Sequence, residues 1–509
     1  MTASWIEVSR LTVNVLHMHV ITSRRSFLAS TSAWAAGCAL GLGKSADHRT
    51  VSILHTTDLH GHILPTKTYS GLGDLGGFAR CATQIRKWRK ENADSLLVDI
   101  GDLYQGTAAS LENEGKLFVD LLGNFEYDAW VLGNHDFDWG PAVLERNIRS
   151  SKTPILTANL TGAPEKVIPW KMAEAGGFKI ALIGLITPGL PYWLTPETLG
   201  GVLPLETIPA LTKSIAQAKS ARADAIVVLG HLGHRKQDDF ANPLHEIITQ
   251  APGADAFIAG HTHVHVPSLQ IGETIFTQAN YFGIHCGKLD LTFDLNTRKL
   301  ISKTAVTEYM DGRIELDPGV INLSQPELKT AAEQLARHLT ALDAPIKGKG
   351  RDSPLARFLC QTFSAALKRN GTPVDAVFHG TFGTPEIPAG IVTVADAWEI
   401  LPYENTFVTA TLTPAQLLEI LAEDRKTYSD RTLWPFEVVW EKRTPVRILR
   451  DGSELDPEKR VTVAFNSYDS QSAGQLLMRL REIIAQPSSK RRPVDINSRD
   501  ALIEGLLNL

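Results

Sequence analysis

The sequence predicts an α/β protein with two globular domains, and three observations support this prediction. The chain has 509 residues, which exceeds the size of one ordinary domain. From Val51 to about Asp311, short apolar runs alternate with helix-like stretches, the pattern of a layered α/β domain. An amphipathic segment and a glycine-containing loop then separate this part from the rest of the chain.

Short runs of apolar and β-branched residues are the predicted strands of the first domain, and seven of them serve as examples. Each run is bounded by Gly, Asp or Asn, which favours buried strands over helices. The runs are Val51–His55, Ser95–Ile100, Ala129–Leu132, Ile155–Ala158, Lys179–Gly184, Ala225–Leu229 and Ala256–Ala259. In sheets of this kind ligands gather beyond the carboxyl ends of the strands, so we expect the functional side chains there.

The segment Pro326–Leu342 has leucine and alanine at helical spacing and is predicted to form one helix. The loop Ala344–Gly350 follows it, so residues 313–350 are expected to be a linker that contains a helix. The predicted organisation is therefore a terminal region 1–46, a first domain 47–312, this linker, and a second domain 351–509.

Composition and charge indicate an ordinary globular protein. Hydrophobic residues make up 43% and charged residues 21% of the chain. The net charge of -5 comes without a basic stripe, so no nucleic-acid polymer is expected as a partner. The four cysteines lack CxxC spacing and indicate neither a thiolate zinc site nor a disulfide framework. A monomer is expected.

The first 46 residues are interpreted as an export signal. Arg24 and Arg25 stand before the alanine-rich run Phe27–Leu42, an arrangement that resembles a twin-arginine signal. This run is too short for a comfortable membrane span, so no transmembrane anchor is expected. The segment Ala35–Cys38 lacks the leucine that usually begins a lipoprotein box, which disfavours lipid anchoring at Cys38. We therefore expect export to the periplasm.

Five predicted strand ends carry carboxylate, imidazole or amide side chains. They are Asp58-Leu59-His60, Gly101-Asp102, Gly133-Asn134-His135-Asp136, Gly230-His231-Leu232-Gly233-His234 and Gly260-His261-Thr262-His263. One such motif proves little, but five in register with strand ends indicate a metal site, and the donor types suit Zn, Mn, Fe or Co. Two cations about 3.5 to 4 Å apart can drive hydrolysis of an otherwise inert phosphomonoester. One carboxylate is the simplest bridge between them, and Asp102 is the natural candidate.

These segments resemble the signature blocks of the calcineurin-like metallophosphoesterases, specifically the 5'-nucleotidase branch, from residue 51 to about residue 480. The resemblance implies a four-layer β-sandwich flanked by helices, joined by a linker helix to a smaller α/β substrate-binding domain. It implies one metal held by Asp58, His60, Asp102 and His263, and a second held by Asp102, Asn134, His231 and His261. Some bacterial members have glutamine where His263 stands, and imidazole is an equally good ligand.

The resemblance also implies a catalytic role for His135. In the family, the residue at this position contacts the phosphate and stabilises the transition state or the leaving group. Asp138 is similar to the carboxylate that orients this histidine and would keep its imidazole protonated. For His62, His234 and His265, which lie within two or three residues of the implied ligands, a role behind the ligands and a solvated position both stay open.

Two segments of the second domain are expected to bind substrate. Pro402–Asn405 and Asn466–Asp469 fall where the family carries its base-stacking aromatics, which implies that Tyr403, Asn405 and Tyr468 contact the substrate. Two aromatic rings around a planar base bury both of its faces at little entropic cost. The alternative is that both tyrosines are core aromatics.

Two departures from the family pattern concern the substrate. Thr384 stands at the position of a family arginine, whose guanidinium would be a strong anion clamp. Ser472–Gln475 replaces a double glycine followed by aspartate, so a carboxylate expected beside the ligand is missing. Both changes leave the predicted chemistry intact and bear on specificity.

The sequence therefore predicts an exported hydrolase that releases phosphate from 5'-nucleotides or related phosphomonoesters by attack of a metal-bound water. A thiosulfohydrolase of sulfur oxidation, which shares the fold, the export route and the two-metal site, is the main alternative. It departs at the asparagine-histidine block, where Gly133–Asp138 resembles the nucleotidase version. A phosphodiesterase or sugar-nucleotide hydrolase on the same fold stays open. A decayed binding protein would have lost a ligand, and none is lost.

Overall fold

The computed structural model describes residues 47–348, 350–381, 383–384, 386–427 and 431–509. The twin-arginine pattern, with Arg24, Arg25 and Cys38, lies outside the described residues. Within the described ranges, no helix combines the length and the apolar character that a membrane crossing requires. Residues His48–Leu509 pack as one unit.

The first part of this unit contains two mixed sheets. One has seven strands in the order β15-β14-β1-β2-β3-β4-β6, in which β1 to β4 are parallel. Their bounds are β1 His48–Thr56, β2 Ser95–Asp99, β3 Ala129–Val131, β4 Ile155–Leu156, β6 Val167–Ile168, β14 His285–Asp294 and β15 Leu300–Tyr309. The other has six strands in the order β12-β13-β11-β10-β8-β7. Their bounds are β7 Trp170–Ala175, β8 Phe178–Ile186, β10 Ala225–His231, β11 Ala256–Ala259, β12 His265–Ile271 and β13 Thr274–Ala279.

The two sheets form a sandwich because their strands bury apolar side chains on the faces that meet. Ile53 and Val98 of the first sheet share one buried cluster with Leu182, Val227 and Ile258 of the second. All seven predicted strands are found in these two sheets, so that prediction is confirmed. A two-stranded ribbon, β5 Leu160–Thr161 with β9 Leu203–Pro204, is not paired with either sheet.

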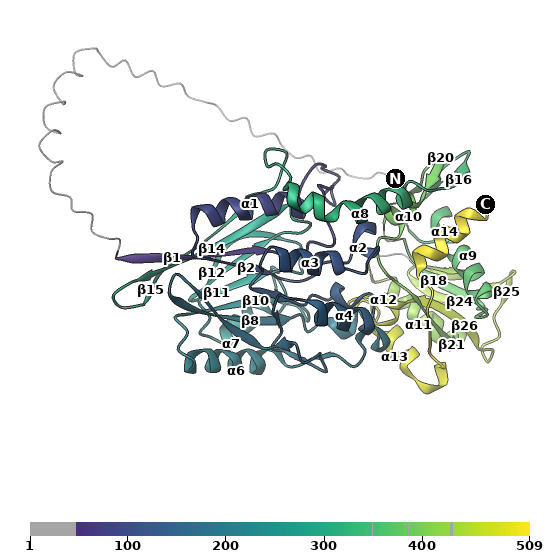
Figure 1. Ribbon diagram of the computed structural model, residues 1–509. Coiled ribbons are helices and arrows are strands. Elements are labelled where there is room, and N and C mark those ends of the chain that lie inside the picture. The colour runs from purple at the N-terminus through teal and green to yellow at the C-terminus, as the bar shows by residue number, and fades with distance from the viewer. Residues whose placement is uncertain (1–46, 349, 382, 385, 428–430) are drawn as a thin grey trace, which may run out of the picture. The chain divides into compact units, whose positions relative to one another are not determined.

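Helices cover the outer face of each sheet, which gives four layers. The first sheet is covered by α1 Phe78–Glu91, α3 Lys116–Asn124 and α4 Pro141–Ser150, whose apolar side chains share a core with its strands. The second is covered by α6 Thr207–Ser220 and α7 Leu244–Gln250. Figure 1 shows α1 and α6 on opposite sides of the strands. Short turns of helix, α2 Ala108–Leu111, η1 His135–Phe137, η2 Leu190–Tyr192 and α5 Pro196–Leu199, lie in the connecting loops. The predicted four-layer architecture is confirmed.

The predicted helix over Pro326–Leu342 is wrong in its bounds. Helix α8 runs from Pro318 to Leu335, and His338–Leu342 forms strand β16. The helix begins early because the side chain of Asp317 accepts a hydrogen bond of 3.0 Å from the N–H of Val320. It ends early because β16 pairs with β20, Gly390–Thr393, and this long-range pairing overrides the helical spacing of the leucines.

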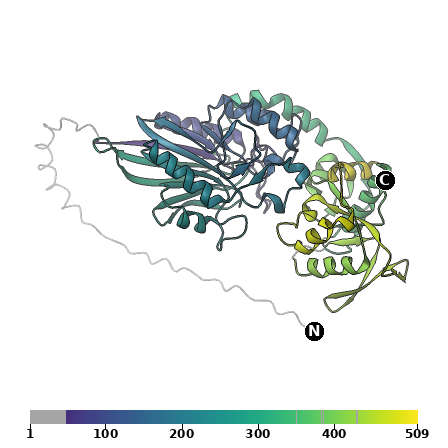
Figure 2. The same cartoon turned by 90° about the horizontal axis from the view of Figure 1, so that it is seen from below.

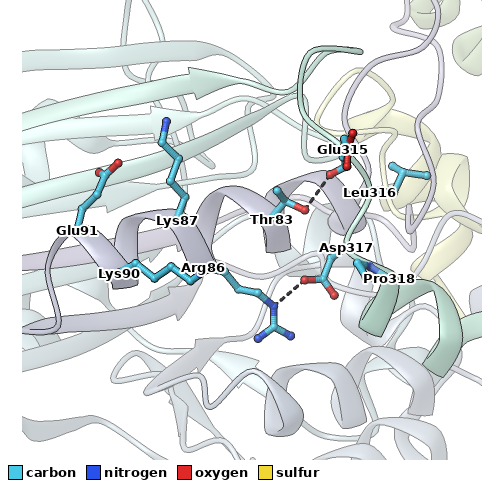
Figure 3. A pocket seen from close by; sticks show the side chains of 9 residues that line it. All are labelled: Thr83, Arg86, Lys87, Lys90, Glu91, Glu315, Leu316, Asp317 and Pro318. Atoms are coloured by element: carbon cyan, nitrogen blue, oxygen red, sulfur yellow. Dashed lines mark hydrogen bonds and ion pairs between the residues drawn. The ribbon is translucent and has the colours of Figure 1, made fainter.

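The start of α8 is tied to α1, and α8 lies against α1 and α2 (Figure 1, Figure 2). The hydroxyl of Thr83 donates to the carbonyl of Glu315 at 2.8 Å, and Arg86 donates to Asp317 at 2.6 Å (Figure 3). Because Asp317 also caps α8, one carboxylate fixes both the helix start and its position on the first domain.

The second domain is a smaller α/β layer structure. Its sheet has the order β22-β18-β26-β21-β27. The strands are β18 Ala376–His379, β21 Phe407–Leu412, β22 Thr432–Trp434, β26 Val461–Asn466 and β27 Arg492–Val494. One face carries α9 Pro354–Arg369, α10 Val394–Ile400 and α14 Ser498–Leu507, and the other carries α11 Pro414–Asp424 and α13 Met478–Ala485. Smaller elements are β17 Ile346–Lys347, β19 Glu386–Ile387, β23 Glu437–Glu441, β24 Thr444–Arg450, β25 Ser453–Glu454, α12 Ser467–Ser470 and η3 Pro487–Ser489.

Candidate metal centre

Strand ends that lie far apart in the sequence converge on one buried cluster. Four ligand atoms lie within 4.8 Å of one another, and they belong to Asp58, His60, Asp102 and His263. A second group within the same limit consists of Asp102, His231 and His261. Asp102 belongs to both groups, so the structure places this carboxylate between two sets of donors.

Asn134, the predicted amide ligand, lies beside the second group. Its Oδ1 is 3.2 Å from Nε2 of His231, and the same Nε2 is 3.2 Å from Oδ2 of Asp102. The structure therefore brings together all seven residues that the resemblance implies as metal ligands.

The backbone at this cluster is left-handed at several residues that carry a Cβ. They are Asp58 (φ 49°), His60 (φ 46°), Asp102 (φ 50°), His261 (φ 72°) and His263 (φ 54°). Such a conformation is uncommon outside glycine and costs on the order of 1–3 kcal/mol at each residue. The surrounding sandwich must stabilise it. Strain concentrated at strand ends in this way is typical of a functional site.

Hydrogen bonds to the main chain orient two of the imidazoles. Nδ1 of His60 lies 3.0 Å from the carbonyl oxygen of Gln105, and Nδ1 of His231 lies 2.7 Å from that of Ile100. A carbonyl only accepts, so Nδ1 carries the proton in both rings. The Nε2 atoms of His60 and His231 face Asp102 at 3.6 and 3.2 Å. Metal-binding histidines are oriented in this way.

The donor set fits divalent cations. Nε2 of His60 and Nε2 of His263 lie 3.1 Å apart, and two nitrogen lone pairs repel each other unless a proton or a cation lies between them. Asp58 and Asp102 are buried, and buried carboxylates need positive partners. Burial lowers the pKa of His60 and of His261 to about 3, so both rings are neutral, as ligands must be.

Asp102 is the electrostatic centre of the cluster. Burial disfavours its charged form, but the neighbouring His231 and His135 outweigh this effect and hold its pKa well below the usual range. Burial likewise opposes protonation of His231, yet the charge of Asp102 raises the pKa of that imidazole to about 9. A bound cation would replace this proton, because a ligating imidazole is neutral.

His135 lies at the edge of the cluster with Asp138 behind it. Its backbone N–H donates to Oδ1 of Asp102 at 2.8 Å, and its Nδ1 lies 2.7 Å from Oδ2 of Asp138. Burial opposes protonation, but the charge of Asp138 raises the pKa of His135 to about 10. The imidazole is therefore protonated at neutral pH, and its Nε2–H is left to donate elsewhere.

A cavity of about 500 Å³ adjoins the cluster. Asn134, His135 and His261 line it from the first domain, and the three residues predicted to bind substrate, Tyr403, Asn405 and Tyr468, line it from the second. Pockets for small ligands have volumes of about 300–1,000 Å³. The cavity therefore has room for a molecule of nucleotide size.

The two tyrosines differ in their surroundings. The side chain of Tyr403 is 43% exposed, and its ring lies nearly parallel to that of His135, with centroids 6.4 Å apart. Tyr468 packs against the apolar core of the second domain and also lines the cavity. Tyr403 therefore lines the cavity and is not part of the core. Tyr468 both lines the cavity and packs in the core of the second domain.

Sequence reasoning missed three residues at this site. The ring of Trp193 lies 5.1 Å from that of His261, Arg235 lines the cavity, and the hydroxyl of Tyr69 lies 3.1 Å from Nδ1 of His263. Trp193 and Tyr69 lie in loops without a recognisable motif. Arg235 directly follows the segment Gly230–His234, and this position in the sequence could have indicated that it lies near the site.

The two positions that depart from the family pattern have local roles. The N–H of Thr384 donates to the carbonyl of Glu399 at 2.8 Å, and Thr384 is not among the cavity-lining residues. All four residues of Ser472–Gln475 have positive φ, and the N–H of Gly474 donates to the carbonyl of Tyr192. This turn therefore contacts the first domain through its main chain and through the hydroxyl of Ser472, which donates to the same carbonyl at 3.3 Å.

Comparison with known proteins gives consistent results for both parts of the chain. Residues 51–265 match the family model of the calcineurin-like phosphoesterases, and residues 336–480 match that of the 5'-nucleotidase C-terminal domain. The chain is 26% identical over 404 residues to a snake venom 5'-nucleotidase of Naja atra, an alignment that covers 70% of this chain and 74% of that protein.

Two solved structures, both from Thermus thermophilus, show the same fold at low identity. One is a 5'-nucleotidase precursor, with a TM-score of 0.68 at 20% identity, covering 90% of this chain and 96% of that one. The other is the sulfate thiohydrolase SoxB, with a TM-score of 0.63 at 16% identity, covering 90% and 94%. Residues 51–265 are thus a calcineurin-like phosphoesterase domain, residues 336–480 are a 5'-nucleotidase C-terminal domain, and the chain is a metal-dependent phosphoric ester hydrolase.

Proposed function

We propose that this protein is an exported, periplasmic phosphohydrolase that uses two divalent cations to release phosphate from 5'-nucleotides or related phosphomonoesters. The observation that carries the proposal is the convergence of two donor groups on Asp102 beside a cavity of about 500 Å³. The Naja atra relative, named a 5'-nucleotidase, supports the substrate class. The twin-arginine pattern before Phe27 supports export.

The cluster would hold the two cations side by side. One would be bound by Asp58, His60, Asp102 and His263, and the other by Asp102, Asn134, His231 and His261. When bound, such a pair polarises the phosphoryl oxygens and lowers the pKa of water, which makes hydrolysis fast at neutral pH. The left-handed backbone at the strand ends keeps the donor atoms in place before substrate arrives.

His135 would act on the substrate directly. Its Nδ1 is occupied by Asp138, so its protonated Nε2 is the atom that can donate to a phosphoryl or leaving-group oxygen. The bond from its backbone N–H to Asp102 holds the main chain of His135 beside the candidate ligands, and the bond to Asp138 orients its ring. We assign catalysis to His135 and orientation to Asp138.

The second domain would hold the leaving group. Tyr403 offers an exposed ring for stacking, Tyr468 forms another aromatic wall, and Asn405 adds a polar group. Because residues of both domains line the cavity, the substrate would be enclosed between them. We take 47–312 as the first domain, 313–350 as the linker that includes α8, and 351–509 as the second domain.

Arg235 is the residue best placed to recognise a second anionic group of the substrate. The cavity-lining carboxylates are already paired, Asp138 with His135 and Glu404 with Arg499. Arg235 is half exposed and forms an ion pair of 3.7 Å with the exposed carboxylate of Asp239, and such a surface pair contributes little and can be exchanged for a ligand. Its guanidinium can therefore supply the anion clamp that Thr384 does not.

We expect Arg235→Ala to raise KM for a nucleoside diphosphate by about 10- to 100-fold, since a charge-assisted hydrogen bond contributes about 1.5–3 kcal/mol. The kcat should change less than about threefold, because Arg235 is neither one of the proposed metal ligands nor part of the His135–Asp138 pair. The measurement is steady-state phosphate release. Lys236→Ala, at the adjacent exposed lysine outside the cavity, is the control and should leave KM unchanged. An unaltered KM in Arg235→Ala would exclude this role.

A phosphate-release screen tests the function itself. The purified protein, stripped with chelator, is assayed with Zn²⁺, Mn²⁺, Fe²⁺ or Co²⁺ added back, against nucleotides, sugar nucleotides, phosphodiesters and simple phosphate esters. We expect release from 5'-nucleotides that depends on the added metal. If no ester is cleaved while the metals are bound, the proposal is wrong.

Sulfur chemistry is the second candidate, because the sulfate thiohydrolase has the same fold. The asparagine-histidine block Gly133–Asp138 argues against it, since it resembles the nucleotidase version. Including a cysteine S-thiosulfonate peptide in the screen separates the two, because sulfate release in place of phosphate release would favour this candidate.

A further inference from the structure

Tyr69 lies on a loop, Thr66–Leu75, that folds against the metal centre. The two ends of the loop are joined by an isolated antiparallel bridge. The ring of Tyr69 stacks on that of Tyr281 with centroids 4.6 Å apart, and its backbone N–H donates to the hydroxyl of Tyr281 at 3.3 Å. Although Tyr69 is 66% exposed, its ring and its main chain are thus both held in place.

The hydroxyl of Tyr69 contacts one of the candidate ligands. It lies 3.1 Å from Nδ1 of His263, and the two rings are within 11° of parallel. The other ring nitrogen, Nε2 of His263, faces the cluster, 3.4 Å from Oδ1 of Asp58. For Nε2 to bind a cation it must present a lone pair, so Nδ1 must carry the proton and donate it to the tyrosine oxygen.

This arrangement differs from that of the other oriented imidazoles. His60 and His231 each donate to a main-chain carbonyl, and their side chains are 7% and 0% exposed. His263 is 23% exposed and relies on the side chain of a surface loop. The two donor groups therefore differ in how their histidines are oriented. The group that contains His263 depends on the hydroxyl of Tyr69, which a single substitution can remove.

We propose that Tyr69 is a positioning residue for His263 and sets the affinity of one cation subsite independently of the other. This inference rests on the proposed two-cation site. The subsite of Asp58, His60, Asp102 and His263 is the weaker and more exchangeable one, because its outermost ligand is oriented from an exposed loop. Loss of such an outer hydrogen-bond partner typically costs 10- to 100-fold in metal affinity.

The test is Mn²⁺ binding to the metal-free Tyr69→Phe variant, which keeps the stacked ring and removes only the acceptor oxygen. We expect the affinity for one of two Mn²⁺ ions to fall by about 10- to 100-fold in calorimetric titration, with the other changed less than about threefold. Electron paramagnetic resonance with one equivalent of Mn²⁺ should then show an isolated ion. The control is Tyr309→Phe, whose ring packs in the same small cluster but against His285 rather than a ligand.

The possible results distinguish the positioning role of Tyr69 from the two-cation site itself. If Tyr69→Phe binds both ions as the wild type does, the positioning role is excluded while the two-cation site stands. If both affinities fall equally, the hydroxyl does not act through His263 and the inference is also wrong. If the wild type binds no Mn²⁺, and no other divalent cation, the proposed function itself is contradicted.

Discussion

Asp102→Ala is expected to lose both cations and to lower turnover by more than about 10⁴-fold, because each metal contributes several kcal/mol of transition-state stabilisation. Asp102 belongs to both donor groups, and its Oδ2 lies 3.2 Å from Nε2 of His231. Without this carboxylate no negative group shared by both donor groups offsets the repulsion between two dications about 4 Å apart. The other ligands then cannot hold the pair.

Metal analysis of purified Asp102→Ala after dialysis checks this expectation. The metal content of Asp102→Asn is a second test. An amide offers one ligand oxygen and no charge, so this variant should hold at most one cation. Asp99→Asn is the matched control, because Asp99 is buried three residues earlier in the same segment. Burial raises the pKa of Asp99 to about 8, so removal of its charge should cost little, and the amide oxygen of asparagine can still accept from the N–H of Gly101. Two cations retained in Asp102→Ala would refute the shared-carboxylate geometry.

The sheets and the positions of the candidate ligands were predictable because they follow from local pattern. Runs such as Ala225–Leu229 are apolar on both faces and end in glycine, and that pattern identifies a buried strand without knowledge of its neighbours. Parallel strands such as β1 and β2 bring their carboxyl ends to one edge, so Asp58 and Asp102 had to approach each other. Most of the candidate site could therefore be predicted once the strands were predicted.

Features that depend on distant partners were not predictable. His338–Leu342 has helical leucine spacing, and only its pairing with Gly390–Thr393 makes it a strand. Tyr69 reaches His263 across 194 positions of sequence, and no spacing rule connects them. The export signal is a different case, because the residues that carry it lie outside the described part of the chain.

His135→Ala should keep both cations and lower kcat by about 10²- to 10³-fold, since one preorganised donor to a developing charge contributes about 2.7–4 kcal/mol. The cations should stay because the imidazole of His135 is not in either donor group, and only its backbone N–H contacts Asp102. That N–H survives substitution by alanine. Metal analysis and steady-state kinetics on the same preparation give both quantities.

Asp138→Asn distinguishes catalysis from mere packing. This change keeps the shape next to Nδ1 of His135 but removes the charge that raises the pKa of that imidazole against the effect of burial. We expect a smaller loss than in His135→Ala, and no further loss when both changes are combined, because the carboxylate acts only through the histidine.

Two substrates with different leaving groups then locate the proton that His135 donates. If its Nε2 protonates the leaving oxygen, p-nitrophenyl phosphate, whose phenolate leaves unaided, should be less affected by His135→Ala than a nucleotide. If it stabilises the phosphoryl oxygens instead, both substrates should slow equally. Loss of a cation in His135→Ala would contradict both readings, because it would make His135 part of the metal site that the geometry excludes it from.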